Sequence, residues 1–369
     1  MNTPHLVLGV TGSIAAYKTP ELTRQLIKAG FSVAPILSEN AHHFVAEAAL
    51  NVVSMNHLEV AKTASVFVIA PATANIISKC AHGIADDLLT SAFLAFTGPK
   101  LIVPAMHTEM YLNPIIQDNI AKLKKYGVHF LGPDTGDLAV GDVGIGRMVD
   151  LELIVLKAQS LLLKPLPLAG KRIIVTAGGT RERMDSVRVI SNLSTGKLGS
   201  MIAHVASFMG AKVDLISTVP VLSNPHLDVV KVESVDDMKT AIEERVGMAD
   251  ALYMAAAVSD FAFETQASKI KRTNLKLDLK PTPDILAGLS KKKKSCRMIG
   301  FCLEDQDLEK RAREKLKKKN LDFIVANKPD SIGKDKRDVL ILSKNSAKAE
   351  QLRGISLIHA AHRLLELTH

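Results

Sequence analysis

The chain has 369 residues, 47% hydrophobic and 23% charged, the balance of a globular protein with room for two domains. No apolar run approaches the ~20 residues that cross a bilayer, and the first ten residues carry no secretory signal, so we expect a cytoplasmic protein without a membrane partner. The cysteines Cys80, Cys296 and Cys302 form no C-x-x-C pair, which argues against a disulfide framework or a four-cysteine zinc site, and the net charge is +9.

The first half alternates apolar strands with helical segments, a pattern typical of a parallel sheet covered on both faces. The expected strands are 5–9, 31–37, 66–70, 101–104 and 128–131. The expected helices are 14–29, 41–53, a stretch that ends at 96 and another that ends at 125. The segment 132–147 is rich in Gly and Asp and has no period, so we predict a functional loop or flap there.

Two prolines at 165 and 167 interrupt a Leu-rich helix and predict a boundary between a domain over 1–165 and one over 170–369. The second half repeats the alternation and predicts another three-layer α/β domain. Its expected strands are 172–176, 213–217, 251–255, 321–325 and 339–342, and its expected helices are 197–209, 235–246 and 350–367.

Charge is unevenly divided between the two halves. Residues 1–169 have 12 Lys and Arg against 13 Asp and Glu, whereas the remainder has 35 against 25. The skew suggests an anionic ligand for the second half, although the lysine run 291–294 has the simpler interpretation of a solvated basic face. Nucleic acid is disfavoured as the partner because aromatic residues make up only 4% of the chain and Trp is absent.

Three segments of the first half follow predicted strands, at the edge where open α/β sheets bind ligands. They are 9–14 (GVTGSI), 71–75 (PATAN) and 104–111 (PAMHTEMY). The first provides backbone N–H groups and the Ser13 hydroxyl for a phosphate, but it lacks the G-x-G-x-x-G spacing of dinucleotide-binding dehydrogenases.

Together with 56–59 (NHLE) and 141–148 (GDVGIGRM), these segments resemble the flavin-containing cysteine decarboxylases, above all the phosphopantothenoylcysteine decarboxylase half of a bifunctional enzyme of coenzyme A biosynthesis. The resemblance implies a flavodoxin-like fold and His57 as the catalytic base, with a flavin that oxidises the substrate thiol so that the neighbouring carboxylate leaves as CO2. It also implies FMN bound by Gly12, Ser13, Ile14, Ser38, Ala70, Pro71, Ala72, Thr73, Asn75 and Met106.

Two positions depart from the family pattern. His107 stands where the family has an Asn that helps to hold the substrate carboxylate, and it still offers a hydrogen bond. Val140 stands where the family has a flap Cys that donates a proton to the ene-thiol intermediate. Since valine has no proton to give and Cys80 is a poor substitute, we expect the decarboxylase to stall after CO2 loss, and Val140→Cys to restore turnover.

In the second half, the segments 176–182 (TAGGTRE) and 190–199 (ISNLSTGKLG) form a Gly-, Ser- and Thr-rich anion site at a helix start. A P-loop is excluded because Ser191 replaces the first glycine and Leu198 follows the lysine. With 255–260, 268–272, 281–286, 300–301 and 312–322, these segments resemble phosphopantothenate–cysteine ligase, the other half of the same bifunctional family.

This second resemblance implies a Rossmann-like domain that uses CTP and Mg2+ to join phosphopantothenate to cysteine through an acyl-cytidylate. Asn192 then positions the acyl intermediate, Lys269 supports its formation, and Asp260 contacts the nucleotide or its metal. Lys315 and Lys319, four residues apart on one helical face, hold the triphosphate. The nucleotide pocket is expected to include Ala255, Ala256, Pro283, Asp284, Ile285, Leu286 and Phe301.

Two other interpretations compete with a bifunctional enzyme: a ligase whose flavin half is a structural or regulatory scaffold, and a regulatory flavoprotein that binds a partner protein. The complete set of ligase segments argues against the second. The family also implies homo-oligomers, with trimers of the flavin half linked by dimers of the ligase half.

Overall fold

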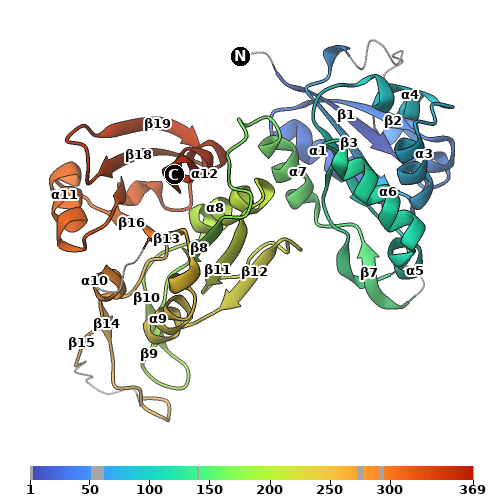
Figure 1. The fold of residues 1–369 in the computed structure, drawn as a ribbon. Coiled ribbons are helices and arrows are strands. Elements are labelled where there is room, and N and C mark those ends of the chain that lie inside the picture. The colour runs from blue at the N-terminus through green and yellow to red at the C-terminus, as the bar shows by residue number, and fades with distance from the viewer. Residues whose placement is uncertain (1–2, 51–61, 139–140, 272–277, 291–294, 369) are drawn as a thin grey trace. The chain divides into compact units, whose positions relative to one another are not determined.

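The computed structural model describes residues 3–50, 62–138, 141–271, 278–290 and 295–368. The chain forms two compact units, one of residues 1–164 with the short segment 222–225, and one of the remaining residues from 165 to 369 (Figure 1). Among the helices in the described ranges, none is long and apolar enough to cross a membrane.

The first unit is built on a five-stranded parallel sheet. Its strands are β1 (His5–Val10), β2 (Ser32–Leu37), β3 (Val66–Ala72), β4 (Lys100–Pro104) and β5 (His129–Phe130), in the order β2-β1-β3-β4-β5. This is the flavodoxin-like order, so the expected fold is confirmed for this unit. β3 is buried along its whole length, which explains its run of apolar residues. The order reverses between β1 and β3, the place where such sheets bind ligands.

Helices cover both faces of this sheet. Figure 1 shows α1 (Thr19–Lys28) with α7 (Leu151–Ser160) on one side and α3 (Ala74–His82), α4 (Leu88–Ala95) and α6 (Pro114–Lys125) on the other. The single helix predicted over 14–29 is instead a 3-10 turn, Ile14–Lys18, followed by α1, because Pro20 begins a new helix. The helix predicted over 41–53 is wrong for its described part, where the short turns Glu39–His43 and Glu47–Ala49 lie.

Three further predictions for the first unit need correction. The stretch that ends at 96 contains two helices, since Gly83 ends α3 in the left-handed conformation. The stretch that ends at 125 is likewise divided, with α5 (Thr108–Leu112) ahead of α6. Within 132–147, β6 (Asp134–Asp137) pairs antiparallel with β7 (Val143–Arg147), and we call this pair of strands the flap hairpin.

The second unit is built on an eight-stranded sheet in the order β12-β11-β8-β13-β16-β17-β18-β19. The six parallel strands are β8 (Arg172–Ala177), β11 (Lys212–Ser217), β12 (Leu227–Lys231), β13 (Ala251–Met254), β16 (Arg297–Leu303) and β17 (Phe323–Asn327). Numbered along the chain, they have the order 3-2-1-4-5-6 of a Rossmann-like sheet, as expected. The order reverses between β8 and β13.

Two antiparallel strands, β18 (Lys336–Ser343) and β19 (Glu350–Ser356), extend this sheet at one edge. They show that the helix predicted over 350–367 is wrong for its first seven residues. Apolar residues at helical spacing begin only at Leu357, so α12 (Leu357–Leu365) follows β19. The preceding segment pairs with β18 and alternates between exposed and half-buried side chains at its start.

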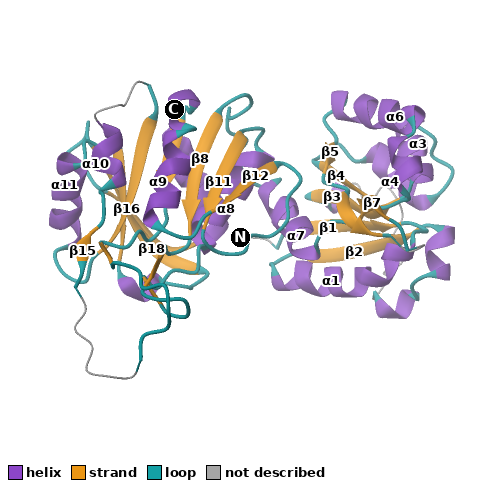
Figure 2. Ribbon diagram, turned by 90° about the horizontal axis from the view of Figure 1, so that it is seen from below, coloured by secondary structure: helices purple, strands orange, loops and turns teal. Residues whose placement is uncertain are grey.

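Helices also lie on both faces of the second sheet, as the view in Figure 2 shows. The apolar core on one face joins α9 (Val235–Glu243), α10 (Ile285–Ser290) and α11 (Leu308–Lys318) to alternate strand residues such as Leu252. On the other face, α8 (Lys197–Phe208) packs on α12, and the buried Tyr253 hydroxyl donates to the carbonyl of Leu364. Two small ribbons, β9 (Arg181–Arg183) with β10 (Val189–Ser191) and β14 (Phe261–Ala262) with β15 (Lys280–Pro281), project from the strand ends.

Candidate functional sites

The reversal point of the first sheet is held together by Thr11. Its buried hydroxyl donates to the carbonyl of Pro71 over 2.8 Å and accepts from the N–H of Thr73 over 3.1 Å. The hydroxyl of Ser13, two residues after Thr11, donates to the carbonyl of Ala105 over 3.2 Å. The carboxyl ends of β1, β3 and β4 are therefore joined through two hydroxyl groups.

A cavity of about 700 Å³ opens at these strand ends. Its wall includes the predicted flavin-binding residues Gly12, Ser13, Ile14, Thr73 and Met106. A Cβ at Gly12 would lie 2.5 Å from the Cβ of Asn40, so only glycine fits at this turn. The volume and the mixed apolar and hydroxyl lining suit an aromatic cofactor with a phosphate tail.

The other predicted flavin-binding residues lie elsewhere around this edge. Ser38 and Asn75 line a second, smaller cavity of about 220 Å³ that shares Gly12 and Thr73 with the first. Ala70, Pro71 and Ala72 are buried in β3 and support the loop from behind.

His107 lies in the wall of the larger cavity, next to the flap hairpin. Its Nδ1 contacts the Glu109 carboxylate, and its Nε2 lies 3.5 Å from Oδ2 of Asp142. The N–H of Met106 donates to the carbonyl of Gly146 over 3.0 Å, which fastens the flap hairpin to the loop after β4. Both ring nitrogens of His107 thus face carboxylates in the wall of the cavity.

Two residues important to the sequence interpretation, His57 and Val140, lie outside the described residues. Cys80 is described: it lies on α3, and burial raises the pKa of its thiol to about 12. A thiol of that pKa is a poor acid and a poor nucleophile near neutral pH.

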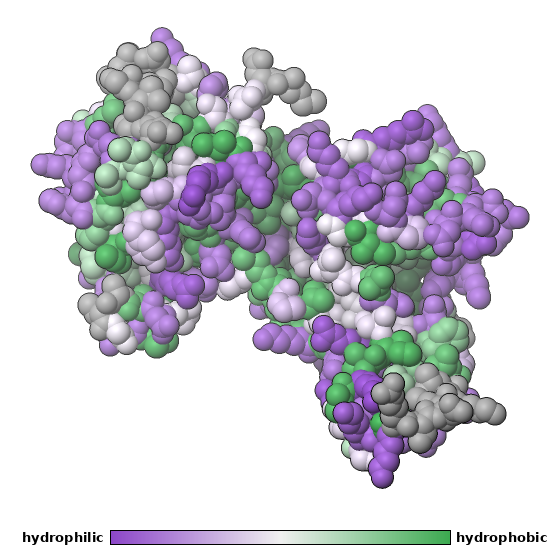
Figure 3. Space-filling model, turned by 180° about the vertical axis from the view of Figure 1, so that it is seen from behind, coloured by the Kyte–Doolittle hydropathy of each residue, from purple (hydrophilic) through white to green (hydrophobic). Residues whose placement is uncertain are grey.

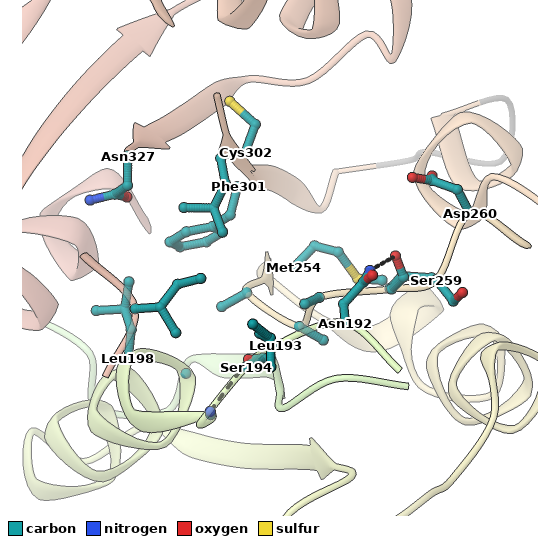
Figure 4. A pocket seen from close by; sticks show the side chains of 18 of the residues that line it. Asn192, Leu193, Ser194, Leu198, Met254, Ser259, Asp260, Phe301, Cys302 and Asn327 are labelled. Carbon is teal, nitrogen blue, oxygen red and sulfur yellow. Dashed lines mark hydrogen bonds between the residues drawn. The ribbon is translucent and has the colours of Figure 1, made fainter. Parts of the chain in front are cut away.

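The second unit has a cavity of about 400 Å³ at the reversal point of its sheet. Figure 4 shows Asn192, Met254, Phe301 and Asn327 around it. The Asn192 side-chain amide donates to the carbonyl of Val258 over 3.0 Å, which orients its oxygen. The cavity is lined by Asn192, Ala255, Ala256, Asp260, Pro283, Asp284, Ile285, Leu286, Phe301, Lys315 and Lys319, so these predicted residues come together.

The start of α8 forms one wall of this cavity, from Gly196 to Gly199. A Cβ at Gly199 would lie 2.5 Å from the carbonyl oxygen of Thr176, so glycine lets the helix start directly against β8. As in any α-helix, the N–H groups of the first turn lack intrahelical partners and present a positive potential. The arrangement favours a phosphate at this wall.

Most cations in the cavity wall already have a carboxylate partner. Lys315 lies 2.7 Å from Glu304, Lys319 lies 3.1 Å from Asp284, and Lys197 lies 3.1 Å from Asp335. The two lysines predicted to hold a triphosphate are thus charge-paired in this structure.

One predicted residue, Asp260, lies at the exposed edge of this cavity, and another, Lys269, lies outside its wall. Asp260 is exposed at the cavity rim, and no group of three or more His, Cys, Asp or Glu residues suited to a metal occurs in the described ranges. Lys269 is exposed in the segment 265–271, which we call the strap, and is not in the cavity wall. Asp185 holds the strap, because its buried carboxylate accepts from the N–H of Ile270 over 3.0 Å.

Sequence reasoning missed three side chains here: Lys197, Asp185 and Arg337. Lys197 was dismissed along with the P-loop, although it follows the Gly-rich loop directly. Arg337 lies in the charged run 334–338 directly ahead of the predicted strand 339–342, where no motif marks it. Its place in the cavity wall depends on the antiparallel strand β18.

Comparisons with known proteins match both units. Residues 1–163 match the family Flavoprotein, and residues 168–369 match the family DNA/pantothenate metabolism flavoprotein C-terminal domain. The coenzyme A biosynthesis bifunctional protein CoaBC of Bacillus subtilis (strain 168) is 39% identical, over 95% of this chain and 93% of that protein.

Two solved structures are also similar. A crystal structure of the C-terminal domain of coenzyme A biosynthesis bifunctional protein CoaBC is 35% identical over 54% of this chain and 94% of its own, with a TM-score of 0.47. The FMN binding protein AtHal3 is 30% identical over 42% of this chain and 94% of its own, with a TM-score of 0.39.

Proposed function

This chain belongs to the family of coenzyme A biosynthesis bifunctional proteins, and from that premise we propose that residues 170–369 are the phosphopantothenate–cysteine ligase and residues 1–165 the phosphopantothenoylcysteine decarboxylase. Membership favours one enzyme with both activities over a ligase with an inert flavin scaffold. The observation that carries the ligase assignment is the second-unit cavity, where Asn192, the start of α8 and several cations meet.

In the first ligase step, a carboxylate oxygen of phosphopantothenate attacks the α-phosphorus of CTP, and the bond to pyrophosphate breaks. The N–H groups at the start of α8 and nearby cations stabilise the phosphate charge. In the second step the cysteine amine attacks the acyl carbon, and CMP leaves. The Asn192 amide, held by Val258, orients the acyl group for that attack.

Lys269 is proposed to assist the first step from the strap, since the strap is held beside the β9–β10 ribbon by Asp185. Mg2+ is proposed to be bound mainly by the triphosphate, with Asp260 as its protein contact, because Mg2+ commonly uses one or two carboxylates together with substrate phosphates. Asp260 is an exposed carboxylate in the cavity wall, which fits that arrangement.

The test is to incubate the purified protein with phosphopantothenate, cysteine, Mg2+ and either CTP or ATP, and to identify products by mass. We expect CMP, pyrophosphate and phosphopantothenoylcysteine together with phosphopantetheine, its decarboxylation product, with CTP preferred. Asn192→Asp should accumulate the acyl-nucleotide, and Lys269→Gln should abolish pyrophosphate release, whereas Lys280→Gln on β15 serves as the charge-matched control. Wild-type rates in the first two variants would refute these roles.

For the first unit, we propose that non-covalent FMN occupies the 700 Å³ cavity, with its phosphate near Gly12 and Ser13. Bound there, the flavin would supply reversible two-electron oxidation and reduction. His57 is proposed to take the substrate proton, and His107 to hold the substrate carboxylate from the cavity wall. An absorbance spectrum without flavin bands, unchanged after incubation with FMN, would contradict the cofactor assignment.

Because family membership favours a working decarboxylase, the stall expected from Val140 is not favoured. We therefore propose that His107 also delivers the proton that valine lacks, since imidazole exchanges protons near neutral pH. With phosphopantothenoylcysteine as substrate, His107→Gln should lower phosphopantetheine formation by roughly 10²–10⁴-fold while a first equivalent of CO2 is still released. His82→Gln, on the exposed end of α3, is the control. Unchanged turnover in His107→Gln would point to another donor.

Oligomers are proposed from exposed apolar side chains on each unit. Ile14 and Tyr17, which line the flavin cavity, are 55% and 63% exposed, as expected if a trimer neighbour completes it. On the second unit, Val187 and Leu193 beside the β9–β10 ribbon are 66% and 83% exposed, and Figure 3 shows apolar surface at this end. We propose dimers there, and light scattering of Leu193→Asp should show a lower mass than wild type. A cytoplasmic location remains a prediction.

A further inference from the structure

The arginine in the wall of the second-unit cavity differs from the neighbouring cations. Whereas the lysines described above each have a carboxylate within 3.1 Å, Arg337 has no carboxylate within ion-pair distance among the described residues. The nearest acidic influence on it is Asp335, which is already paired with Lys197. Among the described cations of the cavity wall, Arg337 is thus the one without a carboxylate partner.

The surroundings of Arg337 leave part of its guanidinium unsatisfied. One terminal nitrogen, Nη2, donates to the carbonyl of Lys334 over 3.0 Å. The Nε–H is buried, and the described part of the chain gives it no acceptor. Burial lowers the pKa of this guanidinium, while Asp335 opposes the shift. A half-buried charge without a carboxylate partner is costly, so an anion beside the guanidinium would be favoured.

Local backbone geometry places this side chain at the cavity. The register of β18 with β19 shifts between Arg337 and Val339, where β19 has one extra residue, and irregularities of this kind change the direction of side chains beside active sites. The loop ahead of β18 lies against the start of α8, where Lys197 Nζ donates to the carbonyl of Gly333 over 3.1 Å. Arg337 therefore stands beside the wall formed by the first turn of α8.

We propose that Arg337 binds a substrate phosphate group at this end of the ligase cavity. The inference rests on the proposed ligase function and adds a residue to its binding site. The guanidinium is planar and pairs with two phosphate oxygens at once, which a lysine cannot do. The start of α8 supplies further donors to the same anion.

The phosphate has two sources in this reaction: the triphosphate of the nucleotide and the phosphate of phosphopantothenate. Both present the same chemistry to an arginine. The experiment distinguishes them with four probes, binding of inorganic pyrophosphate and inorganic phosphate by calorimetry and the KM values for CTP and phosphopantothenate, all with Mg2+ and the full-length protein.

The test compares Arg337→Gln with Arg353→Gln, a charge-matched change of an exposed arginine on β19. Losing a hydrogen-bonded charge pair corresponds to roughly 10- to 100-fold in affinity. A loss of that size for pyrophosphate and CTP assigns Arg337 to the nucleotide. A loss for inorganic phosphate and phosphopantothenate assigns it to the other substrate.

Affinities within twofold of wild type for all four probes in folded Arg337→Gln would overturn the proposal. If that variant does not fold, Arg337→Lys takes its place. Because lysine carries a point charge and not a planar guanidinium, it should lower the affinity for the same probes by more than twofold. Wild-type affinity in this variant would again overturn the proposal. A wild type that makes no ligase product, with pyrophosphate binding still weakened by Arg337→Gln, would refute the ligase assignment and uphold the phosphate site.

Discussion

Replacing the buried lysine of α7 should stabilise the first unit in a pH-dependent way. Lys157 is only 5% exposed, and burial lowers the pKa of its ammonium group from 10.5 to about 8. Each unit of pKa is worth about 1.36 kcal/mol, so keeping this lysine charged in the folded state costs roughly 3 kcal/mol below pH 8. Lys157→Met removes the charge and keeps an unbranched apolar side chain.

The direction in which the free energy of unfolding changes with pH follows from proton binding. Between pH 8 and 10.5 the unfolded chain binds the proton that the folded chain releases, so wild-type stability rises with pH over this interval. We expect Lys157→Met to raise the free energy of unfolding by about 1–3 kcal/mol at pH 7, and by much less at pH 10.5. The expected gain at pH 7 is smaller than the full cost of the buried charge because the substitution also changes the packing.

The assay is urea denaturation at both pH values, followed by tyrosine fluorescence, since three of the four tyrosines (Tyr17, Tyr111 and Tyr126) lie in the first unit. Lys28→Met, on the exposed end of α1, is the control and should change stability by less than about 0.5 kcal/mol. A gain that is absent at pH 7, or equal at both pH values, would refute the reasoning.

Three other predictions follow from buried polar groups. Thr11→Val should lower the melting temperature of the first unit and the FMN retained on purification, because two hydrogen bonds worth about 1–3 kcal/mol are lost. Burial lowers the pKa of His204 to about 4, so the second unit should lose about 2 kcal/mol from pH 7 to pH 5, a loss that His204→Leu abolishes in urea denaturation. Asp185→Asn should speed amide hydrogen exchange at Ile270 in the strap roughly tenfold. It should also lower the kcat of the ligase reaction while leaving the KM for CTP nearly unchanged.

Much of the fold could be predicted because buried parallel strands are continuous apolar runs. β3 and β8 follow this pattern and lie where the sequence predicts strands. The hairpin of β6 and β7 was missed because β6 has no apolar residue and β7 has only Val143 and Ile145 between glycines. β19 was missed because its polar residues precede α12 without a break. In both cases, pairing with a partner strand decides the conformation, and a single segment does not encode its partner.

The candidate sites show the same division between local and long-range information. The loop residues at strand ends were predictable because topology brings all such ends to one edge of the sheet. Lys315 and Lys319 line the cavity, but their carboxylate partners, Glu304 and Asp284, come from other elements. Charge pairing of this kind depends on tertiary contacts. The sequence therefore gives the net charge of the region, but it does not show which cation lacks a carboxylate partner.

That distinction determines where an anion gains the most binding energy. A phosphate that approaches Lys315 must compete with Glu304, which already accepts from it over 2.7 Å and is nearly buried. A phosphate that approaches Arg337 displaces no carboxylate, because none of the described carboxylates is paired with this side chain. The second contact therefore retains more of its electrostatic energy, since no existing pair is broken. By this argument, Arg337→Gln should weaken phosphate binding more than Lys315→Gln does, even though both changes remove one positive charge from the same cavity.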